Sequence, residues 1–170
     1  GLHRGAGVPD HVRDRPHRRS ARLATVDAGT GVAALPRPLA ARQAPSACNR
    51  LPYEYRIFDD PELVKKVADL PFGAAGYSQN IPVIIVVVGK LENYFSPRDR
   101  HAMYIDASLS AMAFMYALET LGLASSVINW PDFEPLEQKM QKTLNLNTEE
   151  RPLMLLAVGY ADPKGKVAYS

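Results

Sequence analysis

The sequence predicts an α+β fold for the part of the chain that follows residue 43. Two apolar runs, 82–88 and 152–160, are typical of strands that are buried on both faces. Helical patterns over 98–121 and 132–144 lie between them along the chain. No Gly-x-Gly-x-x-Gly motif and no phosphate-binding loop occurs, so the sequence argues against a doubly wound nucleotide-binding fold, which needs a glycine-rich turn.

The composition limits the class of protein. A chain of 170 residues suits one domain, which buries about two thirds of its unfolded surface. The single cysteine excludes an internal disulfide and predicts a reducing compartment, the cytoplasm. No Cys/His group has zinc spacing, so no metal is expected. The longest apolar run, 81–88, is far too short to cross a bilayer, and we expect no membrane association.

Residues 1–43 form an Arg/Ala/Pro-rich head that differs in kind from residues 44–170. The first 44 residues hold eight Arg and three Asp, a balance of +5 in a chain of net charge +2, and contain no Lys, Glu, Ile, Phe, Tyr, Trp or Met. One hypothesis is a disordered tail, because few large apolar groups offset the entropy of ordering. A second is a nucleic-acid-binding arm, but no aromatic residues are interleaved with the arginines, so we expect no nucleic-acid partner.

A third hypothesis for the head is translation of a GC-rich gene in the wrong frame. Arg, Ala, Gly and Pro have GC-rich codons, and the residue types absent from the head include those with AT-rich codons. An intact single reading frame with a clean start codon would contradict this hypothesis.

A loop and a strand open the second part of the chain. The alternation of residues 53–58 is typical of a half-buried strand, and Pro45 and Pro52 before it exclude a helix. Ser46 and Asn49 offer short polar side chains that bond to nearby backbone. Ligand contacts often lie on such a rigid loop, although a plain connection with nothing bound is the alternative.

Capping signals place a helix before the central strand. Asp59-Asp60-Pro61-Glu62 combines a capping acid, a proline at the first position and a further acid in the first turn. Leu63, Val67 and Leu70 give the helix one apolar face. A glycine-containing loop over 71–80 then leads into the strand.

The pattern over 98–121 is the longest helix that the sequence predicts. Small residues lie among apolar groups around most of its circumference, and Gly122 ends it. Both features suit a core helix at a subunit interface, because small residues permit close packing of a second helix. Asp132 and Pro135 begin the last helix, which runs to Leu144.

The loop of residues 44–52 carries a family resemblance. Pro45, Ser46, Asn49 and Pro52 fill the Pro-Ser-x-x-Asn-x-x-Pro pattern of FMN-dependent nitroreductases, and the similarity continues to Ser170, over roughly three quarters of the chain. The resemblance implies an intertwined homodimer with a mostly antiparallel central sheet flanked by helices. It also implies that this loop contacts the flavin, often from the other subunit, through Pro45, Ser46, Ala47 and Asn49.

A second segment of the head resembles the opening of the same family. Arg18-Arg19-Ser20-Ala21-Arg22 is similar to its Arg-x-Ser-x-Arg/Lys segment, which implies flavin contacts from Arg18, Arg19, Ser20 and Arg22. The alternative is a chance match in an Arg-rich stretch. Prolines also stand where the family has a helix after this segment.

The stretch 122–132 resembles the turn of the family that faces the flavin. Ile128, Asn129 and Trp130 correspond to positions whose backbone groups reach the N5 and O4 edge of the ring, and many relatives have small or acidic residues in place of the last two. The alternative is that Trp130 only packs the turn. The basic segment that contacts the FMN phosphate in relatives is short or absent here, and Lys164 and Lys166 are candidate substitutes.

The resemblance implies an FMN-dependent NAD(P)H oxidoreductase. NADH or NADPH would reduce the flavin through N5, and a nitroaromatic or quinone would then take the electrons in a ping-pong cycle, with no catalytic side chain required. The alternative is a flavin-binding or flavin-less protein of this fold without turnover, because both phosphate-contacting ends depart from the family pattern.

Overall fold

The computed structural model describes residues 23–24 and 40–162, and over these it is an α+β fold, as predicted. The strands are β1 (Leu23–Ala24), β2 (Tyr53–Phe58), β3 (Val83–Lys90), β4 (Ala124–Asn129) and β5 (Glu150–Ala161). The helices are α1 (Pro61–Ala68), α2 (Ala102–Thr120) and α3 (Glu134–Leu144), with short 3-10 turns in the connections.

The sheet is antiparallel in every strand pair among the described residues, which confirms the predicted mostly antiparallel sheet. β3 lies between β2 and β5, and β5 also pairs with β4 and, at its last two residues, with β1. Tyr53 of β2 lies opposite Gly89 of β3, and Val83 of β3 lies opposite Val158 of β5. β5 therefore joins three other strands into one sheet.

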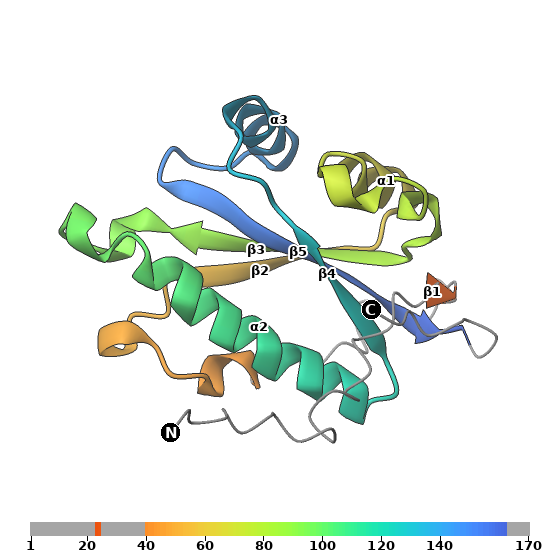
Figure 1. Cartoon of the computed structure of the whole chain (residues 1–170), viewed down its shortest axis with the longest axis horizontal. Helices are drawn as coiled ribbons and strands as arrows, with labels where there is room; N and C mark the ends of the chain where they lie inside the picture. The colour runs from red at the N-terminus through yellow and green to blue at the C-terminus, as the bar shows by residue number, and fades with distance from the viewer. Residues whose placement is uncertain (1–22, 25–39, 163–170) are drawn as a thin grey trace, which may run out of the picture.

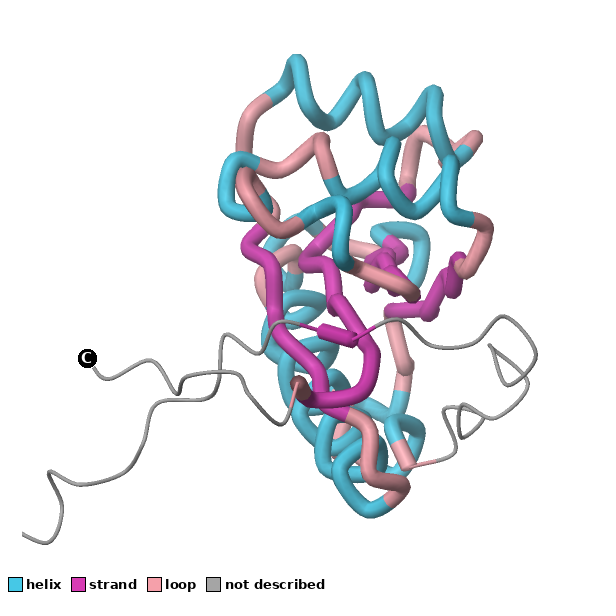
Figure 2. The backbone as a smooth tube through the Cα atoms, turned by 90° about the vertical axis from the view of Figure 1, so that its right-hand side faces the viewer, coloured by secondary structure: helices cyan, strands magenta, loops and turns pink. Residues whose placement is uncertain are grey.

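Helices cover both faces of this sheet. Figures 1 and 2 show α1 and α3 on one face and α2 on the other. β3 serves both layers, because alternate side chains of a strand point to opposite faces: Ile84, Val86 and Val88 pack under α1 and α3, whereas its odd-numbered residues face α2. Among the described helices, none has the length and apolar character that a membrane crossing requires.

The helix boundaries agree with the capping signals at two places and differ at two others. Asp60 caps α1 by accepting from the backbone N–H of Leu63 at 2.9 Å, and Gly122 follows α2 with a φ of 74°. α2 begins at Ala102 rather than near residue 98, because Pro97–Asp99 forms a 3-10 turn of its own. α3 begins at Glu134, so Asp132 does not cap it.

Two pieces of the head belong to the fold. β1 extends the sheet at the end of β5, with Leu23 opposite Ala161. Ala41 is fully buried against α2, where its carbonyl accepts hydrogen bonds from the hydroxyls of Ser110 at 3.0 Å and Tyr53 at 3.4 Å. For residues 1–22 and 25–39 the hypotheses of a disordered or mis-framed head stay predictions.

Candidate functional site

The loop of residues 44–52 holds an unusual backbone conformation. Cys48, Asn49 and Leu51 have φ values of 53°, 54° and 48°, in the left-handed region that non-glycine residues rarely adopt. Asparagine tolerates this region, but each of the others costs about 1–2 kcal/mol. Such a conformation persists only where surrounding contacts impose it, and strained loops of this kind are concentrated at functional sites.

Asp106 of α2 supplies those contacts. This carboxylate is only 4% exposed, and its Oδ2 accepts from the Ser46 hydroxyl at 2.8 Å and from the Ala47 backbone N–H at 2.9 Å. The Ser46 hydroxyl in turn accepts from the Leu51 backbone N–H at 2.9 Å. One buried acid therefore fixes both ends of the strained segment, and the Ser46 hydroxyl is engaged in holding the loop.

A second set of contacts fixes the chain on either side of the loop. The Tyr55 hydroxyl lies 2.7 Å from the Ser110 hydroxyl, which also bonds to the carbonyl of Ala41. Burial raises the pKa of Tyr55 far above its ordinary value, so the phenol stays neutral and keeps its proton for this network. The loop is thus attached to α2 through Ser110 as well as through Asp106.

The second predicted segment lies at the end of β4. Ile128 is buried under α1 and α3, and Trp130 is buried with its indole N–H donating to Oε1 of Glu137 at 2.7 Å. Trp130 therefore packs the turn, as one of the two interpretations of the sequence expected. Asn129 is exposed, so this residue is the one of the three whose side chain is accessible to a ligand.

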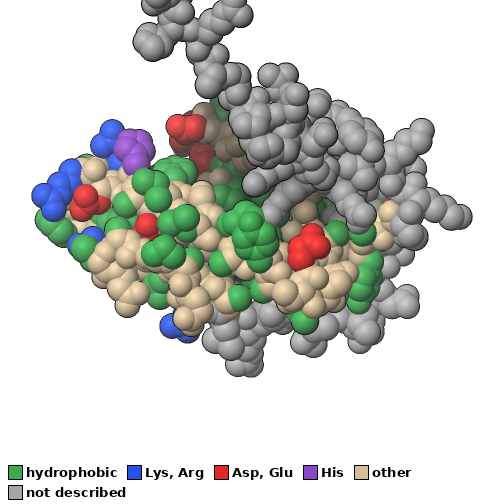
Figure 3. Space-filling view, turned by 60° about the horizontal axis from the view of Figure 1, so that its bottom comes forward, with side chains coloured by type: hydrophobic (Ala, Val, Ile, Leu, Met, Phe, Trp, Pro, Cys, Tyr) green, Lys and Arg blue, Asp and Glu red, His purple; other side chains and the backbone are tan. Residues whose placement is uncertain are grey.

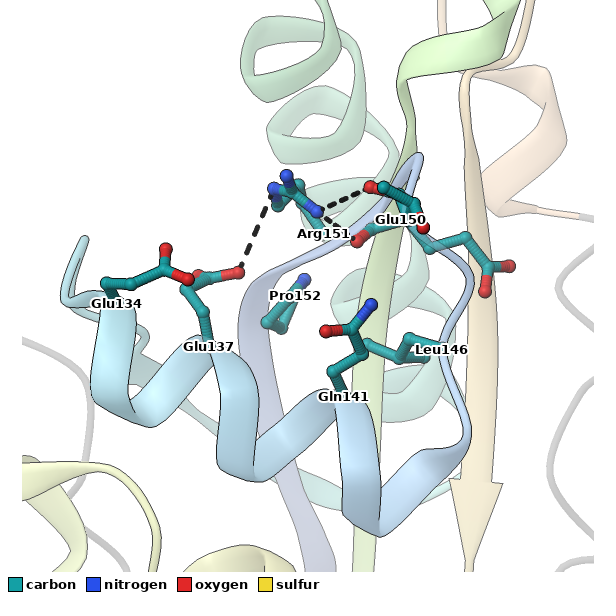
Figure 4. A pocket seen from close by; sticks show the side chains of 8 residues that line it. Glu134, Glu137, Gln141, Leu146, Glu150, Arg151 and Pro152 are labelled. Atoms are coloured by element: carbon teal, nitrogen blue, oxygen red, sulfur yellow. Dashed lines mark hydrogen bonds and ion pairs between the residues drawn. The ribbon is translucent and has the colours of Figure 1, made fainter.

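Glu137 lines a small pocket between α3 and the start of β5 (Figure 4). The pocket has a volume of about 180 Å³, and Nε of Arg151 lies 4.0 Å from Oε2 of Glu137. Burial raises the pKa of Glu137, and the charges of Asp132 and Glu134 add to this, while the Trp130 N–H and Arg151 oppose it. Over the described residues, no group of three His, Cys, Asp or Glu side chains is arranged to hold a metal ion.

The two predicted segments lie on different elements, and the side chains of the second segment point to both faces of the sheet. The loop with Pro45, Ser46, Ala47 and Asn49 is attached to α2, whereas Ile128 and Trp130 pack on the side of α1 and α3 (Figure 1). Asn129 alternates with Ile128 along β4 and lies opposite Met154, which packs on the α2 side, so its side chain is on the same face of the sheet as the loop. Arg18, Arg19, Ser20 and Arg22, as well as Lys164 and Lys166, lie outside the described residues.

Asp106 is the residue that sequence reasoning missed. Its position in the middle of an apolar helical run was a usable signal, because a buried carboxylate needs hydrogen-bond donors. The sequence did not reveal which donors those are, since Ser46 lies 60 positions away.

The model of the nitroreductase family matches residues 71–160, more than half of the chain. No curated protein sequence matches this chain.

Solved structures agree on the fold. An FMN-dependent nitroreductase from Clostridium difficile is 21% identical, with 90% of this chain and 88% of that chain covered and a TM-score of 0.71. A proposed NADH oxidase from Clostridium acetobutylicum is 22% identical, with 90% of each chain covered and a TM-score of 0.70. A nitroreductase family protein from Streptococcus pneumoniae is 22% identical, with 90% and 91% covered and a TM-score of 0.66. The chain belongs to the nitroreductase family.

Proposed function

We propose that this protein is an FMN-dependent oxidoreductase that takes electrons from NADH or NADPH and passes them to a nitroaromatic, a quinone or a similar acceptor, the two substrates entering in alternation. Family membership supports an oxidoreductase, and the names of an FMN-dependent nitroreductase and a proposed NADH oxidase among the structural neighbours support the cofactor and the reductant. The lone cysteine, Cys48, is in keeping with a cytoplasmic location.

The strained loop is the observation that carries the proposal. Its hydrogen bonds to Asp106 hold the backbone in place, and they leave Pro45, Ala47 and Asn49 exposed on its outer side. Preorganised contacts of this kind are what a cofactor site requires, because binding then costs less ordering entropy. The remaining contacts expected from the head, at Arg18, Arg19, Ser20 and Arg22, stay predictions.

The exposed polar side chains suit a flavin ring. The amides of Asn49 and Asn129 each offer donors and an acceptor, which match the alternating donors and acceptors of the pyrimidine edge. Bound FMN would supply the hydride and electron chemistry, and the protein would orient the ring and exclude water from it.

A homodimer would complete the site. In relatives the loop that corresponds to Asn49 often contacts the flavin from the other subunit, and this family pattern supports a second copy in the complete site. α2 offers a surface for that copy: Ile105, Leu109 and Tyr116 lie on its outer side and are 61%, 45% and 60% exposed. Figure 3 shows hydrophobic side chains along this face. An exposed apolar stripe on a long helix is typical of a protein–protein interface.

Visible absorption of the purified, dialysed protein is the first test. We expect a flavin spectrum, release of FMN on denaturation and oxidation of NADH or NADPH when a quinone or nitroaromatic is added. Bound flavin without oxidation would favour the alternative of a protein without turnover. A colourless protein that does not take up added FMN would contradict the proposed function.

A variant of the loop gives a sharper test. Asn49→Gly removes the amide but keeps the left-handed backbone, because glycine adopts positive φ freely. We expect the Kd for FMN to rise about tenfold, as for the loss of a ligand hydrogen bond. Gln138→Ala, an exposed amide removed from α3, should leave the Kd unchanged.

A further inference from the structure

A second pocket lies next to the candidate cofactor loop, in the segment between β3 and α2. It has a volume of about 360 Å³ and is lined by Leu91, Tyr94, Phe95, Ser96, Pro97 and Arg100. The side-chain amide of Asn93 donates to the carbonyl of Arg50 at 3.1 Å, so this segment is tied to the loop of residues 44–52. The pocket therefore adjoins the site proposed above without using its residues.

Cationic groups surround these apolar walls. The guanidinium carbon of Arg50 lies 5.7 Å from the ring centre of Tyr94 and 6.0 Å from that of Phe95, and the guanidinium carbon of Arg98 lies 5.4 Å from Phe95. Arg100 lines the pocket itself. Asp99 forms an ion pair with Arg98 at 3.6 Å, and the charge of Asp106 also acts on Tyr94, so three guanidinium groups stand against two carboxylates and leave a small excess of positive charge.

Phe95 is an exposed ring that a bound ligand would shield from water. Phe95 is 78% exposed, although a phenylalanine gains free energy when it is removed from water. The hydroxyl of Tyr94 is buried, and no group within the described ranges bonds to it. Burial also raises the pKa of Tyr94 to about 12, so the phenol is protonated at neutral pH.

We propose that this pocket binds the electron acceptor, and that the acceptor is an aromatic compound carrying a carboxylate. The aromatic ring packs against the walls formed by Leu91, Tyr94 and Pro97, and the carboxylate meets the guanidinium groups, of which Arg100 is the nearest to the cavity. This inference rests on the proposed oxidoreductase function and adds the class of acceptor.

The volume separates this ligand from the reductant. Pockets for small molecules measure about 300–1,000 Å³, and one at the low end of that range suits a compound of one or two rings. NADH and NADPH also carry aromatic rings and anionic groups, but a whole dinucleotide does not fit in this space. An experiment can therefore distinguish a small aromatic carboxylate from NADH or NADPH as the ligand of this pocket.

The test compares 4-nitrobenzoate with 4-nitrobenzamide, which has nearly the same shape and no charge. Equilibrium dialysis against the purified protein measures binding whether or not turnover occurs, and steady-state KM values with saturating NADH measure it in the working enzyme. We expect 4-nitrobenzoate to bind about fivefold more tightly, with the preference falling at high salt because salt screens exposed charges.

Pairs of matched variants show which residues cause the preference for 4-nitrobenzoate over 4-nitrobenzamide. Arg100→Gln should remove most of the preference for the carboxylate, whereas Lys66→Gln removes the same charge from exposed α1 and should preserve it. Phe95→Leu should weaken the binding of both probes about threefold, and Phe72→Leu, at another exposed phenylalanine, should not.

Three outcomes would overturn the proposal. The first is that the wild-type protein binds the two probes with equal affinity. The second is that the Arg100→Gln variant still prefers 4-nitrobenzoate. The third is that NADH displaces 4-nitrobenzoate competitively and that Arg100→Gln weakens this displacement. The last result would assign the pocket to the reductant. A protein without flavin or activity would contradict the proposed function but would still give a valid dialysis result.

Discussion

Asp106 is the residue on which the shape of the candidate cofactor loop depends. Asp106→Ala removes Oδ2, the one oxygen that accepts from both the Ser46 hydroxyl and the Ala47 backbone N–H. Because a buried donor would then lack a partner, we expect the free energy of unfolding to fall by about 1–3 kcal/mol. Urea unfolding measures this. Glu119→Gln, an exposed acid on the same helix, should change it by less than about 0.5 kcal/mol.

Glu137 makes stability depend on pH. Burial and the nearby acids raise its pKa above the ordinary 4.5, so the folded protein retains a proton at pH values where the unfolded chain has lost it. The resulting stabilisation is complete below the unfolded pKa and is lost as the pH rises through the folded pKa. We therefore expect the free energy of unfolding of the wild type, minus that of Glu137→Gln, to fall from about pH 4 upward.

Unfolding in urea at a series of pH values would show this slope. Glu137→Gln keeps an oxygen that accepts from the Trp130 indole, so the comparison isolates the proton. Glu62→Gln, at an exposed position of α1, should retain the wild-type slope. A difference between wild type and Glu137→Gln that does not vary with pH would contradict the prediction.

Single residues were predictable from the sequence where the interaction is local. Asp60 caps α1 through a residue three positions away, and Gly122 ends α2 by its own backbone freedom. The Asp106–Ser46 bond spans 60 positions, and local rules contain no information about it. The Trp130–Glu137 bond is only seven positions long, yet it crosses from a turn to a helix whose packing the sequence does not specify.

At the scale of elements, β3 and α2 are in contact through a glycine. A Cβ at Gly89 would lie 2.7 Å from Cγ of Met103 and 2.9 Å from Cδ1 of Leu153. Gly89→Ala therefore overfills the contact, and we expect the free energy of unfolding to fall by about 1–3 kcal/mol. Gly73→Ala adds the same methyl group where nothing lies within 4 Å, so it should be close to neutral in the same unfolding experiment.

Elements were predicted well wherever periodicity alone decides them. The central strand reads as apolar on both faces, and β3 does serve two cores. The bounds of α2 were less predictable, because the 3-10 turn at Pro97–Asp99 has a helical composition. The strand register could not be predicted. Val87 of β3 pairs with Met154 of β5 and Val88 pairs with Pro152, so Leu153 has no partner in this pairing, and such irregularities depend on contacts between strands.

For the whole molecule, the proposed homodimer predicts that a charge on α2 separates the subunits. Leu109→Asp places a carboxylate in the centre of the exposed stripe, where burial against a second subunit would be costly. We expect a monomer in sedimentation experiments, together with a lower FMN content because the loop and the turn no longer meet. Phe72→Asp changes a more exposed residue away from α2 and should remain dimeric. A wild-type protein that is monomeric and binds FMN would exclude this arrangement.

The assembled site was the feature least accessible from the sequence of one chain. Both candidate segments were recognisable from their patterns, but the face of the sheet to which each side chain points depends on the topology and the register. The basic and aromatic pocket at Phe95 also escaped notice, because Arg50 and Arg98 lie 48 positions apart.

The position of β5 in the chain has a consequence for synthesis on the ribosome. β3 and β4 both pair with β5, which is synthesised after them. Each therefore has an unpaired edge until residues 150–161 have left the ribosome. Unpaired apolar strands are prone to join other chains, and translation proceeds at only about 5–20 residues per second. The nascent protein is therefore exposed to aggregation until the last described strand leaves the exit tunnel, and chaperone binding during that interval would raise its yield.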